Sequence, residues 1–236
     1  MKRLYLLTCF IIFYANTGIC QQSFDSLNAY AILNKAIEAQ GGKAFLQSIK
    51  TMYTVTKTRM DGIEVDWTVK EMLPNKGAFI ITNRNRVIYQ SWFDGKSGFE
   101  IVNGKKKKQY VEDYKDKLYK RNIINELDYI DAGLWKIKLL GEEKVLNEDC
   151  YKIEATLLSG LVKHLYYSKS SFFLLKEEKI LNAERNSFFI FYYFSYKQTG
   201  QLTHFTEIKF GEIGKFQDGK LVELVINDLV DDKDFK

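Results

Sequence analysis

Residues 188–196 constrain the fold of this chain more than any other stretch. They read Phe-Phe-Ile-Phe-Tyr-Tyr-Phe-Ser-Tyr, so eight of the nine side chains are apolar or aromatic. Nine residues cannot cross a bilayer, which needs about 20 in a helix, and the aromatic content favours a β-strand. A strand with one wet face alternates apolar and polar side chains, and this one does not. Both faces of the predicted strand therefore need a cover: a helix, another sheet or an apolar ligand.

The first 20 residues have the pattern of a secretory signal peptide. Lys2 and Arg3 form a basic start, and residues 4–13 form a short apolar core. We expect cleavage after Cys20, which leaves one domain, residues 21–236, in the periplasm. In the alternative, Cys20 is acylated and anchors the protein in the envelope. Ile19 argues against acylation, because a small residue is expected before a lipidated cysteine.

Charge and cysteine content exclude several classes of function. The chain carries a formal net charge of +5, and removing the signal peptide lowers it, so a nucleic-acid partner is not expected. Beyond residue 20 the only cysteine is Cys150, which excludes an internal disulfide and a cysteine-based zinc site. Export without disulfides is typical of a bacterial envelope protein.

Helical periodicity is confined to three segments. In residues 26–40, an apolar stripe that includes Leu33 and Ile37 predicts a helix; Ser26 or Asn28 can cap it, and two glycines end it. A short helix is expected at 44–49. A third is predicted over residues 112–130, where apolar side chains recur on one face.

Most of the remaining chain has the period of two that is typical of strands. Strand patterns separated by turn signals fill residues 51–102 and 136–229, and they predict about eleven antiparallel strands. The lysine run 105–108 reads as a solvated hairpin tip, or alternatively as a contact for anionic lipid headgroups. The acidic segment 231–236 reads as a free end. The predicted class is mainly β with a few helices (α+β), built on a single curled sheet.

Three consecutive segments, residues 161–167, 172–175 and 188–196, lack a polar face and should be neighbours in the sheet. The two longer predicted helices are too few to coat both faces of such a sheet. A concave face left apolar would bind hydrocarbon. In the alternative, the chain's own aromatic side chains fill the interior.

The predicted cavity lining follows from the apolar stripe of each strand and from the proposed helical lid. A slip of one residue would move a strand's whole set to the other face. The predicted lining residues are Trp67, Val69, Phe79, Tyr89, Trp92, Trp135, Tyr167, Leu174, Phe191 and Tyr193.

The sequence lacks the catalytic motifs that we sought: the nucleophile elbow, the Walker loop, the dinucleotide fingerprint and the zincin helix. His164 and His204 stand alone in predicted strands, and Cys150 reads as a buried, inert thiol. The acid pairs at 142–143, 177–178 and 231–232 read as solvated charges. We therefore expect no enzyme, no metal and no cofactor.

The order and spacing of several motifs resemble the periplasmic LolA/LolB-type lipoprotein-sorting family, in its Bacteroidetes variety. Residues 39–51 resemble its opening of helix, Gly-Gly, helix and first strand. Residues 92–98 resemble its Asp-Gly-Lys hairpin, and residues 140–153 its Leu-Gly-x-Glu hairpin. Residues 194–200 match more loosely, because the family continues to a proline where this chain has His204.

The resemblance implies an incomplete, half-open β-barrel of about eleven strands with helices over its mouth. It also implies a carrier that shields acyl chains of lipid or lipoprotein on the way to the outer membrane. The expected partners are those acyl chains, a transient membrane contact and an envelope protein for handover, with the carrier a monomer. Two alternatives stay open at this point: an interaction or sensing module without lipid cargo, and a hydrolase for lipid-like substrates.

Overall fold

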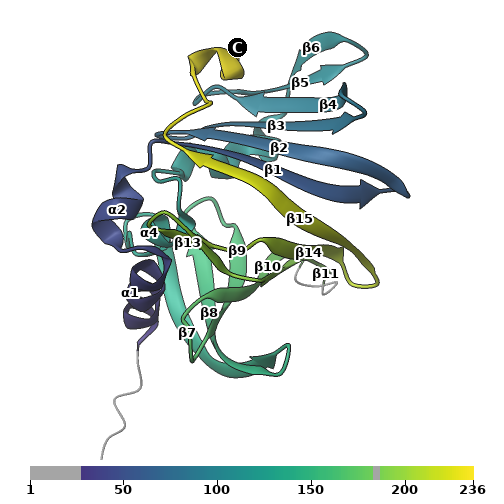
Figure 1. The fold of residues 1–236 in the computed structure, drawn as a ribbon. Helices are drawn as coiled ribbons and strands as arrows, with labels where there is room; N and C mark the ends of the chain where they lie inside the picture. Colours follow the sequence, from purple (N-terminus) through teal and green to yellow (C-terminus); the bar gives the residue numbers. More distant parts are fainter. Residues whose placement is uncertain (1–27, 183–186) are drawn as a thin grey trace, which may run out of the picture.

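The computed structural model describes residues 28–182 and 187–236 (Figure 1). The predicted signal peptide, residues 1–20, lies outside the described residues. Cleavage and lipidation at Cys20 therefore stay predictions, as does the division into a signal and one domain over residues 21–236.

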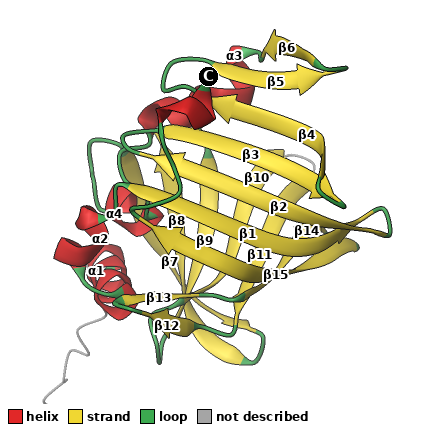
Figure 2. Ribbon diagram, turned by 45° about the horizontal axis from the view of Figure 1, so that its top comes forward, coloured by secondary structure: helices red, strands yellow, loops and turns green. Residues whose placement is uncertain are grey.

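One open antiparallel sheet of thirteen strands dominates the fold, and its curl is plain in Figure 2. Its strands in chain order are β1 Thr51–Met60, β2 Ile63–Met72, β3 Lys76–Asn83, β4 Arg86–Phe93, β5 Gly98–Val102, β6 Lys105–Lys108, β7 Trp135–Val145, β8 Glu148–Leu157, β9 Val162–Ser168, β10 Leu174–Asn182, β11 Ser187–Phe194, β14 Glu207–Glu212 and β15 Lys215–Ile226. Their order in the sheet is β6-β5-β4-β3-β2-β1-β15-β14-β11-β10-β9-β8-β7, so β6 and β7 are its edges. The predicted class, mainly β with a few helices on one open antiparallel sheet, is confirmed.

The strand count exceeds the expected eleven for local reasons. The lysine run is strand β6, paired with β5 and exposed at all four side chains, rather than a hairpin tip. The predicted strand over residues 202–210 is broken at Phe205. Its first part, β13 (Leu202–His204), leaves the main sheet and pairs with β12 (Lys197–Thr199) in a separate two-stranded ribbon.

The first two helices form where the sequence predicts them. Helix α1 spans Ala29–Gln40, and the Asn28 side chain accepts a hydrogen bond from the Ala31 backbone N–H at 2.8 Å. Gly41 ends it with φ 138°, where a Cβ would lie 2.5 Å from the Gln201 carbonyl oxygen, so only glycine fits. Helix α2 follows at Lys43–Ser48.

The single helix predicted over residues 112–130 is wrong, because the segment is broken into three short pieces. They are α3 (Val111–Tyr114), the 3₁₀ helix η1 (Lys115–Tyr119) and α4 (Asn125–Tyr129). Between η1 and α4, the Asp128 carboxylate accepts hydrogen bonds from the Arg121 backbone N–H at 3.2 Å and the Asn122 amide at 2.8 Å. The Asp128 side chain thus satisfies the Arg121 backbone N–H, which a continuous helix would pair along its own backbone.

Strands β9, β10 and β11 are neighbours, as predicted, and β11 is covered differently on its two faces. We call the face that carries Trp67, Phe79 and Phe191 the inner face, and the opposite one the outer face. On the outer face the Lys176 Nζ lies 4.6 Å from the ring centre of Tyr166 and 5.6 Å from that of Tyr192. Lysine stems and aromatic rings thus cover this face, with the ammonium held over π-faces.

The C-terminal segment is packed, so the predicted free end is wrong. Residues Asp232–Phe235 form the 3₁₀ helix η2, and the Phe235 side chain is buried against Ala78 and Trp92 on the outer face. The ion pairs Lys70–Asp234 and Lys76–Asp232 hold η2 on strands β2 and β3. An apolar anchor and two ion pairs offset the entropy of ordering this end.

Helices α1 and α4 pack on the inner face of strands β7–β9, and we call this region the packed half. Ile32 and Leu33 of α1 are fully buried there, together with Ile153, Leu165 and Tyr167 of the sheet. Tyr129 of α4 meets Trp135 edge-on at 4.9 Å between ring centres. Here the chain's own side chains fill the interior.

Candidate functional site

The inner face of strands β1–β3, β15, β14, β11 and β10 borders an apolar cavity of about 540 Å³, and we call this region the hollow half. Strands β1–β3, β15, β14, β11 and β10 form its wall, while α4, the end of α1 and β13 close it on the helical side. Its apolar lining residues are Met52, Trp67, Val69, Phe79, Ile123, Ile124, Leu174, Phe191, Leu202, Phe205, Ile208, Leu221 and Leu224.

Aromatic rings dominate the sheet side of this cavity. Trp67 lies 5.4 Å from Phe79 and 4.4 Å from Phe210 between ring centres, and Phe191 lies 6.1 Å from Phe210. Trp67, Phe79 and Phe191 are only half-buried although they lie inside the curl of the sheet. Cross-strand pairing therefore leaves part of each ring without a protein neighbour, so apolar surface remains available to a ligand.

Six of the ten predicted lining residues border the cavity. They are Trp67, Val69, Phe79, Leu174, Phe191 and Tyr193. Tyr89 shares the inner face, 6.1 Å from Phe79 between ring centres, but lies outside the lining. Trp135 and Tyr167 lie on the inner face of the packed half, where α1 and α4 cover them.

Trp92 does not face the cavity, and its predicted place in the lining is corrected. It stands opposite Ala78 in the β3–β4 ladder and packs on the outer face with Phe235. The apolar pattern of β4 is ambiguous because both faces of its end are buried. No local pattern indicates that the distant C-terminal segment covers the outer face.

The cavity also has charged lining residues that were not predicted: Glu71, Lys120, Glu126 and Glu177. Glu177 was expected to be solvated, and it is 7% exposed instead. It stands directly opposite Phe191 in the β10–β11 ladder, so the two share the inner face. The strand register between β10 and β11 would have placed Glu177 on the inner face. The composition and spacing of the acidic pairs do not contain that information.

Two of the cavity's carboxylates are paired with lysines. Lys163 lies 2.8 Å from Glu177, and Lys120 lies 3.1 Å from Glu71. Glu126 of α4 instead accepts a hydrogen bond from the Tyr167 hydroxyl at 3.2 Å. Burial raises the pKa of the Glu126 carboxyl, while hydrogen bonds from Gln40 and Tyr167 oppose the shift. The apolar cavity therefore has one distinctly polar end.

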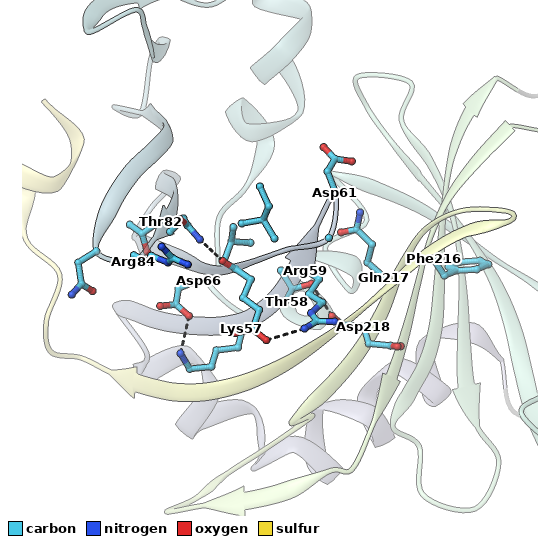
Figure 3. A pocket seen from close by; sticks show the side chains of 16 residues that line it. Lys57, Thr58, Arg59, Asp61, Asp66, Thr82, Arg84, Phe216, Gln217 and Asp218 are labelled. Atoms are coloured by element: carbon cyan, nitrogen blue, oxygen red, sulfur yellow. Dashed lines mark hydrogen bonds and ion pairs between the residues drawn. The ribbon is translucent and has the colours of Figure 1, made fainter.

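A second and larger depression, of about 1120 Å³, is lined by polar side chains at the hairpin tips of β1–β2, β3–β4 and β14–β15 (Figure 3). Lys57 pairs with Asp66 at 3.0 Å and Arg59 with Glu64 at 3.2 Å across its floor. These pairs are largely exposed and both signs of charge are present, so the depression has no field of one sign. Its apolar lining is limited to Ile63, Val65 and Phe216.

The two histidines stand in ordinary structural contacts. His164 lies 3.2 Å from the Glu178 carboxylate on the outer face, and His204 lies 2.8 Å from the Phe205 carbonyl oxygen. Cys150 is fully buried, and burial raises the pKa of its thiol to about 11, which keeps it protonated. Within residues 28–182 and 187–236, no three His, Cys, Asp or Glu side chains gather in a way that would hold a metal ion.

None of the helices in the described part of the chain has both the length and the apolar character to cross a bilayer.

Comparison with known proteins finds likeness in structure rather than in sequence. No family model matches the chain, and no curated protein matches it. A LolA superfamily protein from Nitrosomonas europaea matches with a TM-score of 0.60 at 17% identity, over 89% of this chain and 98% of that one. A DUF1329 family protein from Desulfovibrio piger matches with a TM-score of 0.58 at 13% identity, over 87% and 96%.

A domain from Vibrio parahaemolyticus, named for outer membrane lipoprotein sorting, matches with a TM-score of 0.57 at 15% identity, over 88% of this chain and 95% of that domain. At such identities the likeness establishes a shared fold. The predicted resemblance is confirmed at that level, and the Bacteroidetes type stays a prediction.

Proposed function

We propose that this protein is an envelope carrier that shields acyl chains of a lipid or lipoprotein in the cavity of the hollow half. In this proposal the carrier is a monomer, contacts the membrane transiently and passes its cargo to an envelope partner. The proposal extends a fold shared with a lipoprotein-sorting domain to the function of this chain.

The observation that carries the proposal is the cavity itself. Its volume of about 540 Å³ is in the range of ligand sites, which are typically about 300–1,000 Å³. Its sheet wall consists of half-buried aromatic and aliphatic side chains. Each buried methylene contributes about 0.8 kcal/mol, so a chain of about 14 carbons offers roughly 10 kcal/mol before ordering costs. No catalytic group is needed for such binding.

In the proposal, the helical side of the cavity serves as the lid. Ile123 and Ile124, just before α4, and Leu202 of β13 close the cavity opposite the aromatic wall. These pieces are short and are joined by loops, so they can shift without disturbing the ladders of the main sheet. An acyl chain would enter by displacing this side rather than by parting the strands.

Native mass spectrometry of protein purified without detergent tests the proposal, and we expect a bound lipid. Apo protein should then take up a fluorescent fatty alcohol with an affinity that rises with chain length, because each added methylene is buried. Protein that is free of lipid and takes up no alkyl probe of any length would contradict the proposal.

A further inference from the structure

The polar end of the cavity is assembled from separate elements. Glu126 and Tyr129 come from α4, Glu177 from β10 and Tyr193 from β11, and all four side chains line the cavity. Glu126 is 6% exposed and Glu177 is 7% exposed, so this end is shielded from bulk water. The four are close enough that the charges of both glutamates act on both tyrosine hydroxyls.

The charges at this end do not balance. Lys163 lies 2.8 Å from Glu177 and donates a hydrogen bond to the Tyr129 hydroxyl at 3.3 Å, so its charge is paired and two of its three donors are used. Among the described residues, no ion pair forms at Glu126, whose side-chain hydrogen bonds come from two neutral groups, the Tyr167 hydroxyl and the Gln40 amide. Lys120, which lines the cavity, is held by Glu71. At the polar end, two carboxyls thus face Lys163 alone, and both lysines already have an acidic partner.

This charge imbalance determines which head group of an amphiphile would bind favourably at the polar end of the cavity. An anionic head would bring a further negative charge into the poorly hydrated space that already holds Glu126 and Glu177, where burying a charge without a cationic partner is costly. An ammonium group would supply the cation that Glu126 lacks, through a charge-assisted hydrogen bond. A hydroxyl could donate to the same carboxyl without a change of charge.

We infer that the cavity selects long-chain amphiphiles whose head donates hydrogen bonds, a primary amine above all, and rejects those with an anionic head. Glu126 is the residue that recognises the head, and Lys163, already paired with Glu177, offers an anionic head no unpaired cation. The inference rests on the proposed function and narrows it to a class of ligand.

The test compares dodecylamine, dodecanol and dodecanoate by isothermal titration calorimetry at pH 7, each below its micelle concentration. The wild-type protein should bind the amine at least about tenfold more tightly than the carboxylate, a difference of about 1.4 kcal/mol in binding free energy. The affinity for the alcohol should lie between the two. In Glu126→Gln the amine should lose about tenfold in affinity, while the alcohol changes little.

Glu38→Gln is the matched control, because it removes the same charge from an exposed position on α1. It should leave the affinity for all three compounds unchanged, which separates local recognition from net charge. Circular dichroism would confirm that both variants are folded.

The outcomes distinguish this inference from the proposed function. If all three compounds bind equally to the wild type, or if Glu126→Gln leaves the preference intact, the head-group inference is overturned and the carrier proposal stands. If no dodecyl compound binds, both are overturned.

Discussion

The packed half and the hollow half belong to the same sheet, yet one is filled and the other is not. In the packed half, Ile153, Leu165 and Tyr167 are fully buried beneath α1. In the hollow half, Trp67 and Phe191 point to the same interior and remain half-exposed. Both halves are rich in apolar and aromatic side chains, so strand composition does not explain the difference.

The amount of cover explains it. Helix α1 has 12 residues and is about 18 Å long, and α4 is shorter still. Thirteen strands spaced about 4.8 Å apart extend for nearly 60 Å along the curl. The helices can therefore seal one end of the inner face and must leave the other to loops, to the two-stranded ribbon and, in our proposal, to cargo.

The largest expected effect separates the two halves by stability. Leu165→Ala in the packed half should lower the free energy of unfolding by about 2–5 kcal/mol, because it leaves a void among immobile neighbours. The same substitution at the half-buried cavity residue Leu221 should cost about 1 kcal/mol. Urea denaturation of both variants measures the contrast, and equal losses would show that the hollow half is packed in solution.

The next effect separates the halves by ligand uptake. Phe191→Asp or Trp67→Asp would place a carboxylate on the aromatic wall of the cavity. The variant should take up an alkyl probe at least about tenfold less tightly, because the bound probe would bury the carboxylate at a cost of several kcal/mol. Val87→Asp, at an exposed position of β4, is the control and should bind normally. Unchanged uptake by a folded Phe191→Asp protein would remove that residue from the proposed site.

A smaller effect is expected at the start of α1. Asn28→Ala removes the hydrogen bond to the Ala31 N–H and should cost about 1 kcal/mol of stability. Because α1 covers mainly the packed half, alkyl uptake by the folded variant should stay within about twofold of wild type. A large loss of uptake with normal stability would mean that α1 gates the cavity.

The smallest expected effect is a pH dependence of protein stability that arises from Glu126, at the boundary of the two halves. Burial raises the pKa of Glu126 above its ordinary value of 4.5, so the folded protein holds this proton more tightly than the unfolded chain does. Its contribution to stability is therefore present at low pH and is lost as the pH rises from about 4.5 through the folded pKa. The stability of wild type relative to Glu126→Gln should fall over that range, and a flat difference would contradict the raised pKa.

The sequence predicted those parts of the fold that local patterns control. The ends of α1 follow from its capping residues, and the neighbouring strands β9–β11 follow from consecutive segments that lack a polar face. The helix predicted at 112–130 failed because Asp128 offered the backbone alternative hydrogen bonds. The prediction that Trp92 lines the cavity is wrong for a different reason: Phe235, which covers Trp92 on the outer face, lies far away in the sequence. The cavity charges were hidden because only the register between β10 and β11 places Glu177 beside Phe191.

Strand β6 has a consequence for how copies of the protein meet. An unclosed sheet ends in backbone N–H and C=O groups that could pair with another strand, which is a known route to fibres. Here all four residues of that edge are exposed lysines, and Lys106 is held over Phe99 at 4.1 Å. Two such edges would repel each other before their backbones could join, so the barrel can remain open at this seam without seeding aggregation.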